Sequence, residues 1–424
     1  MENYKLTYID LFAGAGGLSE GFIQCGFQPI AHVEMNEYAA KTIETRIAYY
    51  YLKRTGNLSK YYQYEKGNIS RKELLALVPK EELKTVINRE MSISSLPEIY
   101  TSIDSIMAEN NIRQVDVIIG GPPCQAYSLV GRAQSSHMLI PMKDDPRNDL
   151  YLLYVQFLSK YMPRMFVFEN VSGIQTARGG QAFRNLQAEL KRVGYDIDFQ
   201  ELNAQDFGVL QKRKRVIIVG WLRGTGYKYP TFIPVRSNAK VYDLLSDLTE
   251  LLPGDSSSDY RENDLRKVRP YARQNEIRKK NDVLTGHVAR PHTKQDIEIY
   301  RRVIELWFEN NRHERLRYDD LPDALKTHRN RTSFVDRFKV VEGDMDHCHT
   351  VLAHLSKDGH YFIHPDINQH RSITVREAAR LQSFQDDYYF EGPRTAQFIQ
   401  IGNAVPPMMA KAIAKKLQEQ LEKI

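Results

Sequence analysis

The chain has 424 residues, 42% of them hydrophobic and 26% charged, and a formal net charge of +6. A chain of this length can build one large domain or two moderate ones, and the mild excess of basic residues is compatible with a nucleic-acid partner. No segment approaches the run of about 18 apolar residues that a membrane span needs, and the start MENYKLTYID has no signal-peptide core, so we expect a cytoplasmic protein.

The first half of the chain alternates short apolar runs with amphipathic stretches. This alternation is typical of βαβ units around a mostly parallel sheet. Apolar residues at three- and four-residue spacing predict helices over 150–161 and 181–193. Strands are predicted at 6–12, 29–34, 115–121, 165–170, 196–202 and 215–220. We therefore expect a doubly wound, Rossmann-like α/β domain.

A glycine-rich turn, YIDLFAGAGGLSEGF, follows the first predicted strand and precedes a helix. Gly14, Gly16 and Gly17 let the backbone approach a ligand closely, and the helix that follows presents free N–H groups. Glu34 ends the second predicted strand, where a carboxylate can bind both hydroxyls of a ribose. Because Ser19 occupies the third glycine position of the dinucleotide fingerprint, the pattern favours an adenosine-type ligand without specifying which one.

Each cysteine must be interpreted singly, because Cys25, Cys124 and Cys348 are odd in number and far apart in the sequence. Cys124 lies in GGPPCQAYS, after a predicted strand, at the sheet edge where open α/β sheets bind their ligands. The two prolines before it fix the backbone and give a rigid approach to the thiol. The alternative for an isolated cysteine is a small buried hydrophobic residue.

Charged side chains lie at the ends of neighbouring predicted strands. Glu169 ends the strand in FVFENVSG, and Arg213 and Arg215 lie in QKRKR, where the strand RVIIVG begins. Together with Cys124, these residues offer a nucleophile, an acid and an oxygen-binding cation.

One reaction combines these groups with an adenosine cofactor, namely methylation of cytosine at C5 by S-adenosylmethionine. C5 is a poor nucleophile until a thiolate adds to C6, and a carboxylic acid at N3 with a guanidinium at O2 stabilises the charge that develops on the ring. Burial would favour the protonated form of Glu169, while the arginines would favour the thiolate of Cys124.

The second half of the chain loses the alternation of strands and helices. The stretch 224–365 has many turn-forming residues and two basic segments that carry aromatic residues, at 266–280 and 310–320. Composition alone leaves two interpretations open, a domain for a polyanionic partner and a solvated linker with charged helices. Helical patterns return at 374–384 and 406–424, the second with two prolines suited to a first helical turn.

Six motifs occur in the order of one enzyme family and span nearly the whole chain: DLFAGAGGLSEGF, GGPPCQAYS, FENVSG, QKRKRVIIVG, RSITVREAARLQSF and QIGNAVPP. On these motifs the sequence strongly resembles the DNA (cytosine-5)-methyltransferase family of bacterial type. The resemblance implies an S-adenosylmethionine-dependent enzyme that flips a cytosine out of duplex DNA and methylates it at a specific short sequence.

The resemblance also assigns roles to matching residues. Cys124 is expected to be the nucleophile, Glu169 the N3 partner, and Arg213 and Arg215 the active-site arginines, with Arg215 the better candidate for O2. Asn68, in KGNIS, stands where the family usually has an aspartate after the third strand, and its carbonyl can accept the same hydrogen bond. The expected cofactor contacts are Asp10, Phe12, Gly14, Gly16, Gly17, Leu18, Glu34, Met35, Asn68, Ile69, Pro122, Leu150, Asn403, Ala404 and Val405.

By the same resemblance the chain divides into a catalytic domain at 1–223, a smaller, irregular target-recognition domain at 224–370, and late motifs at 371–424 whose last helix returns to the catalytic domain. The two basic segments are then expected to contact DNA, mainly at phosphates. Double-stranded DNA is the expected partner of a monomeric, nucleoid-associated enzyme, which either has a cognate restriction endonuclease acting on the same site or acts alone. DHCHT at 346–350 lacks further ligands at suitable spacing, so no metal site is expected.

Three other functions share some of these sequence features with DNA cytosine-5 methylation. The tRNA cytosine-5 methyltransferase resembles the DNA family in these motifs but carries a Cys-Phe-Thr tripeptide in its recognition region, which this sequence lacks. A non-catalytic DNA-binding homologue would not need the thiol, the carboxyl and the arginines together. A nicotinamide-dependent oxidoreductase is suggested by the glycine loop alone and leaves Cys124 unexplained.

Overall fold

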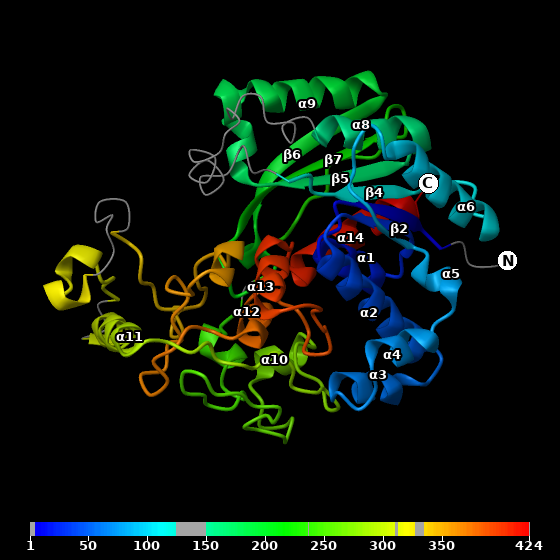
Figure 1. Ribbon diagram of the computed structural model, residues 1–424. Helices are drawn as coiled ribbons and strands as arrows, with labels where there is room; N and C mark the ends of the chain where they lie inside the picture. The colour runs from blue at the N-terminus through cyan, green and yellow to red at the C-terminus, as the bar shows by residue number, and fades with distance from the viewer. Residues whose placement is uncertain (1–4, 124–149, 236, 310–312, 327–334, 424) are drawn as a thin grey trace.

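The computed structural model describes residues 5–123, 150–235, 237–309, 313–326 and 335–423 (Figure 1). Cys124 and the rest of 124–149 lie outside these described ranges. Figure 1 shows a sheet with its helices on one side of the molecule and a more irregular region, which includes α11 (Lys294–Phe308), on the other.

The described strands form a seven-stranded sheet in the order β3-β2-β1-β4-β5-β7-β6. Strands β1 to β5 run parallel to one another, whereas β7 pairs antiparallel with both β5 and β6. This topology confirms the doubly wound, Rossmann-like α/β class and the six predicted strands. The bounds are β1 Thr7–Leu11, β2 Gln28–Glu34, β3 Val86–Asn88, β4 Val117–Gly120, β5 Met165–Asn170, β6 Tyr195–Asn203 and β7 Lys214–Leu222.

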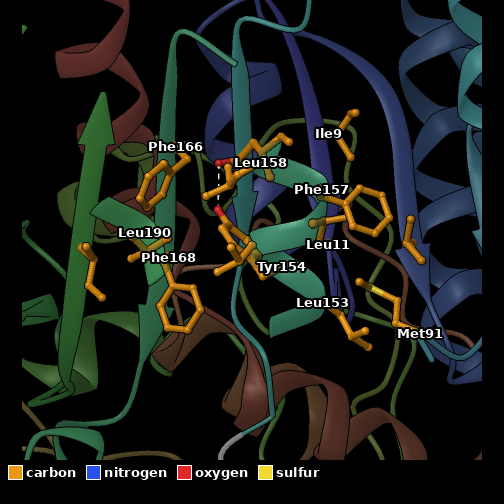
Figure 2. Close-up of a cluster of buried hydrophobic side chains, with 14 of the residues drawn as sticks. Ile9, Leu11, Met91, Leu153, Tyr154, Phe157, Leu158, Phe166, Phe168 and Leu190 are labelled. Atoms are coloured by element: carbon orange, nitrogen blue, oxygen red, sulfur yellow. Dashed lines mark hydrogen bonds between the residues drawn. The ribbon is translucent and has the colours of Figure 1, made fainter. Parts of the chain in front are cut away.

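Helices cover both faces of the sheet, which is why its central parallel strands read as continuous apolar runs. One face packs against α6 (Leu96–Glu109), α8 (Leu150–Tyr161) and α9 (Gln181–Arg192) in a core that Figure 2 shows in part. The other face packs against α1 (Gly17–Gln24) and α14 (Pro407–Leu421).

The last helix lies directly against the first, although they come from opposite ends of the chain (Figure 1). A Cβ added to Gly21 of α1 would lie 2.3 Å from backbone atoms of Ala410 and Lys411 in α14. Glycine at this position therefore permits the two helix backbones to touch, and α14 completes the core on this face of the sheet.

Four helices separate β2 from β3. Residues of α2, α3 and α4 enclose an apolar cluster rich in tyrosine. The third strand was missed from the sequence because β3 has only three residues, none of them buried. The bounds of the inserted helices are α2 Glu37–Arg54, α3 Leu58–Glu65, α4 Arg71–Ala76 and α5 Lys80–Leu83.

The segment after β7 has little regular structure. α11 builds a small core with Leu316, Tyr318 and Phe338. A second core combines this segment with the late motifs, through α10 (Pro270–Gln274), α12 (Val375–Leu381) and α13 (Arg394–Asn403). None of the helices within the described ranges is long and apolar enough to cross a bilayer. Short 3-10 helices occur at Ser172–Gln175, Ala177–Gly180, Ala204–Asp206, Val241–Leu244, Tyr318–Asp320, Asp323–Leu325 and Ala353–Ser356.

Candidate active site

The carboxyl ends of the parallel strands meet at one edge of the sheet. The register pairs Leu11 of β1 with Gly120 of β4, and Gly120 with Phe168 of β5. A Cβ on Gly120 would lie 2.3 Å from the Leu11 carbonyl oxygen, so β4 and β1 approach closely here. The glycine loop, the segment Gly120 to Pro123 and Glu169 therefore lie side by side, at the edge where open α/β sheets bind ligands.

The glycine loop has a left-handed backbone at Phe12, Gly14 and Gly16, with φ of 57°, 56° and 77°. The Gly14 N–H donates to Glu34 Oε2 and the Asn36 N–H to Glu34 Oε1, both at 2.7 Å. Burial raises the pKa of Glu34, and these two hydrogen bonds oppose that shift. Each carboxylate oxygen accepts more than one hydrogen bond, so Glu34 can still bind ribose hydroxyls.

The last predicted cofactor segment lies against the start of α1. A Cβ on Gly17 would lie 2.4 Å from the Val405 carbonyl oxygen and 3.0 Å from Ala404 Cβ. Asn403 is exposed at the end of α13. Gly16 caps α1 without a side chain, so the first N–H groups of the helix are available to a ligand.

Glu169 and Arg215 form an ion pair where β5 ends. Arg215 Nε lies 2.7 Å from Glu169 Oε1, and the two side chains are only 12% and 13% exposed. They meet because β7 runs antiparallel to β5, which puts the start of β7 beside the end of β5. Gly121 makes room for the carboxylate, since a Cβ there would lie 2.5 Å from Glu169 Oε2.

Asn170 connects the turn after β5 with the proline segment. Its Oδ1 accepts a hydrogen bond from the Val171 N–H at 2.8 Å, and its Nδ2 donates to the Pro122 carbonyl at 3.4 Å. Pro122 is thus placed beside Glu169, two residues before Cys124. Cys124 lies outside the described residues, so its role as nucleophile stays a prediction.

Arg213, expected from the resemblance to be an active-site arginine, is completely buried and binds the main chain. Its two terminal nitrogens donate to the carbonyls of Val351 at 2.9 Å and Gly402 at 3.0 Å. Burial lowers the pKa of its guanidinium well below the ordinary value. The structure therefore pairs Arg215, and not Arg213, with Glu169.

Other predicted cofactor residues lie around this edge at different depths. Asp10 is buried, with its carboxylate 3.8 Å from His32 Nδ1, and burial raises its pKa. Leu18 is buried in the core beneath α1, whereas Met35 is 61% exposed. Leu150 begins α8 and packs partly against the core of the opposite face. Asp10 and Leu18 thus support the loop from inside the protein.

The expected position of Asn68 at the end of the third strand is wrong. Asn68 is exposed after α3, with its N–H bonded to the Gln63 carbonyl at 2.9 Å. Ile69 packs against the tyrosine-rich cluster of the inserted helices. The insertion moves this segment away from the sheet edge, because the chain runs through α4 and α5 before it reaches β3.

Sequence reasoning missed two residues at the true third strand, one at its end and one just after it. Asn88 ends β3, and its Nδ2 donates to the Glu34 carbonyl at 2.8 Å. Glu90 comes two residues later as an exposed carboxylate. The only signal in the sequence was VINRE, a short apolar pair followed by polar residues.

The basic segment 266–280 is exposed only in part. The Arg266 side chain is 88% exposed, whereas Arg278 is 4% exposed within an internal cluster of acidic residues. Lys279 Nζ donates to Asp387 Oδ2 at 2.5 Å. Arg278 and Lys279 therefore form ion pairs with buried carboxylates, whereas Lys280 is exposed, and the expectation of DNA contact is wrong for Arg278.

The DHCHT segment begins with the exposed Asp346 and contains one buried residue, Cys348. His349 Nδ1 lies 2.8 Å from Glu342 Oε2, and its Nε2 lies 2.6 Å from the Tyr361 carbonyl. Across the part of the chain that the structure describes, no group of three or more His, Cys, Asp or Glu side chains could hold a metal ion.

Comparison with known proteins gives one family. The model of the C-5 cytosine-specific DNA methylase family matches residues 6–68 and 88–419. The unmatched residues between these ranges include α4 and α5. Type II methyltransferase M.Bpa9945I of Bacillus paralicheniformis is 40% identical, over 98% of this chain and 99% of the relative. Type II methyltransferase M1.HphI of Haemophilus parahaemolyticus is 30% identical, over 97% of this chain and 86% of the relative.

Solved structures share the fold. A DNA modification methyltransferase encoded within an E. coli prophage matches with a TM-score of 0.63 at 24% identity, covering 99% of this chain and 100% of the other. The Entamoeba histolytica methyltransferase EhMeth matches with a TM-score of 0.55 at 15% identity, covering 99% of each chain.

Proposed function

The chain belongs to the C-5 cytosine-specific DNA methylase family and is a DNA cytosine-5-methyltransferase, and we propose that Glu169 and Arg215 bind the target cytosine. The observation that carries this proposal is the 2.7 Å ion pair between Arg215 Nε and Glu169 Oε1 at the ligand-binding edge of the sheet. N3 and O2 of cytosine are both bonded to C2 and accept hydrogen bonds on the same edge of the base. Two side chains that already touch are therefore spaced to bind both atoms, the carboxyl at N3 and the guanidinium at O2.

Cys124 supplies the nucleophile in this proposal. Its thiolate adds to C6 and forms the Sγ–C6 bond, while Glu169 gives a proton to N3 and Arg215 stabilises O2. C5 would then accept the methyl group of the donor and lose its proton to a base, the Sγ–C6 bond would break to release the thiolate, and N3 would return its proton to the Glu169 carboxylate. Gly121 leaves space for the Glu169 carboxylate, and Asn170 holds the proline segment that leads to the thiol.

The proposed methyl donor is S-adenosylmethionine, which supplies an electrophilic methyl group when bound. The residues fit such a ligand, because nothing lies within 4 Å of a Cβ built on Gly14 and the start of α1 has no side-chain cap. Glu34 would bind the ribose hydroxyls at the end of β2. Glu90, rather than Asn68, would accept the hydrogen bond of the adenine amino group, because it follows β3 beside Glu34.

The enzyme acts on double-stranded DNA, and a stacked cytosine hides C6 from a thiol, so the base must leave the helix. We assign the catalytic domain to 1–223, target recognition to 224–370 and the late motifs to 371–424. The small core around α11 supports a recognition module, and the exposed Arg266 is suited to a phosphate contact.

The relatives M.Bpa9945I and M1.HphI are named type II methyltransferases. By analogy, we assign this chain to the modification half of a restriction–modification pair, acting as a monomer on the site that its endonuclease cuts. Protection of DNA against a candidate cognate endonuclease in cells that express this chain would test this assignment.

The proposed function is tested by methyl transfer from labelled S-adenosylmethionine to duplex DNA, to tRNA and to no acceptor, followed by bisulfite sequencing of the DNA. We expect label in DNA at one short recurring sequence. Cys124→Ser should abolish transfer and leave DNA binding largely intact, whereas substantial methylation by this variant would refute the role of Cys124. Label confined to tRNA would move the enzyme to the rival substrate.

A further inference from the structure

A buried tyrosine outside the six motifs holds the glycine loop. The Tyr388 hydroxyl donates to the Ala15 carbonyl at 2.5 Å, and Tyr388 is only 1% exposed. Its ring packs against Phe384 and Phe390, with centroids 4.8 Å and 5.2 Å away. A Cβ on Gly16 would lie 3.0 Å from the same hydroxyl, so the loop backbone rests directly on this side chain.

Arg46 of α2 holds Tyr388 in place. Its guanidinium carbon lies 4.7 Å from the centre of the Tyr388 ring. It binds both oxygens of Glu20 in α1, at 2.9 Å and 2.7 Å, and Asp387 Oδ1 at 2.9 Å. Two further bonds, to the Asp387 carbonyl at 3.1 Å and to Gln385 Oε1 at 3.1 Å, use the remaining donors. A guanidinium with all five donors bound has one orientation.

This buried cluster joins three parts of the chain. Glu20 belongs to the helix that follows the glycine loop, Arg46 to the inserted helices, and Asp387 and Tyr388 to the loop after α12. Lys279 reaches the cluster from the recognition segment through its bond to Asp387 at 2.5 Å. The loop backbone is thus anchored by side chains that lie far from it in sequence.

The geometry assigns Tyr388 as a positioning residue for the methyl donor, with Arg46 as its support, and this inference rests on the proposed use of S-adenosylmethionine. A peptide unit is planar, and the Ala15–Gly16 unit is held at both ends, by the Tyr388 hydroxyl on the Ala15 carbonyl and by the Gly16 N–H on the Ala13 carbonyl at 2.9 Å. Gly16 precedes α1 in a left-handed conformation that glycine does not itself enforce. Tyr388 therefore fixes the peptide unit through which the chain enters α1, and with it the position of the helix N-terminus that faces the cofactor.

The test compares Tyr388→Phe with Tyr195→Phe. Tyr195 is a matched control, since it is equally buried and its hydroxyl donates to the Pro163 carbonyl at 2.8 Å, away from the glycine loop. Calorimetry would give the Kd for S-adenosylmethionine, steady-state kinetics kcat and KM, and thermal unfolding the Tm. Tyr388→Phe should raise the Kd and the KM for the cofactor about tenfold, the size of one lost hydrogen bond, with kcat at saturating cofactor within about twofold of wild type.

The control, Tyr195→Phe, should lower the Tm about as much as Tyr388→Phe does, and it should leave the Kd for S-adenosylmethionine unchanged. Arg46→Lys, which keeps the charge but loses the fork, should shift the Kd in the same direction as Tyr388→Phe. The positioning role would be overturned if Tyr388→Phe had the wild-type Kd for S-adenosylmethionine. It would also be overturned if Tyr195→Phe lost as much affinity for S-adenosylmethionine as Tyr388→Phe. Wild-type protein that binds no S-adenosylmethionine would instead refute the proposed function on which the inference rests.

Discussion

Arg215 Nε lies 2.7 Å from Glu169 Oε1, although 46 positions separate the two residues and their strands run in opposite directions. The contact depends on the reversal of β7 relative to the parallel strands, which returns the start of β7 to the ligand-binding edge. A carboxyl and a guanidinium that share this edge of the sheet can stabilise charge that develops at N3 and O2 of a bound cytosine.

Arg215→Ala should lower kcat by about 10²- to 10³-fold, because it removes a donor aimed at charge that develops during the reaction. Its free energy of unfolding should change little, since the described partners of its side chain are Glu169 and the neighbouring Lys214 carbonyl. Arg213→Met should instead lower the free energy of unfolding and have a much smaller effect on kcat. It leaves the buried carbonyls of Val351 and Gly402 without partners, at a cost of about 2–4 kcal/mol in stability. Urea denaturation and initial rates on both variants would check this contrast, and similar kinetic losses in the two would contradict it.

Gly121→Ala should displace the Glu169 carboxylate and reduce kcat while cofactor binding is kept. The added Cβ would lie 2.5 Å from Glu169 Oε2, so the side chain must rotate away from its ion pair. Gly220→Ala is the matched control, because its Cβ would lie 2.1 Å from the Phe166 ring in the core. We expect that control to lose stability without a specific loss of kcat in the folded fraction. Wild-type kcat in Gly121→Ala would count against a catalytic carboxylate.

Glu90→Ala should weaken S-adenosylmethionine binding by about five- to tenfold, the effect of one hydrogen bond to the adenine amino group. Asn68→Ala should leave the Kd unchanged, since Asn68 is exposed after α3. Calorimetric titration of both variants gives the answer directly. If Asn68→Ala weakens binding and Glu90→Ala does not, the alignment based on KGNIS is correct and the structural assignment is not.

Acid should destabilise the recognition region through His364. Burial, together with nearby Arg371, lowers its pKa from 6.5 to about 3. The unfolded chain binds the proton more readily, so this contribution to stability is complete above pH 6.5 and is lost as the pH falls toward 3. We expect this residue to remove about 2 kcal/mol between pH 6.5 and about pH 5.

His364→Gln separates this effect from other titrating groups, because the amide cannot take up the proton. The variant should be less stable than wild type at neutral pH and show a shallower decrease below pH 6.5. Urea unfolding at several pH values would measure both slopes, and parallel slopes would exclude His364 as the source.

Local pattern predicted much of the fold. All six predicted strands are present, and their ends differ from the observed ones by two residues at most. The helix predicted at 150–161 is α8, with the same bounds. These predictions succeed because a buried strand or an amphipathic helix imposes its period on residues that are neighbours in sequence. Strand β3 was not predicted, since its three residues are too few to show a period of apolar positions.

Side-chain roles were predicted less well. Arg213 and Arg215 have the same chemistry two residues apart, yet one binds main-chain carbonyls in the interior and the other binds Glu169. Arg278 and Lys279 carry the charge expected of a DNA contact, but their partners are Asp247 and Asp387. A charged residue takes its function from whichever groups surround it, and those groups come from distant parts of the chain.

The fold class, the glycine loop at the end of the first strand and the carboxylates of Glu34 and Glu169 at strand ends could all be predicted from the sequence, because they depend on short-range order. The contact of Arg215 with Glu169, the displacement of Asn68 from the sheet edge and the bond from Tyr388 to Ala15 across 373 positions became apparent only in the folded protein. The physical reason is that hydrogen bonds and ion pairs act over a few ångströms, and packing alone brings such distant residues within that range.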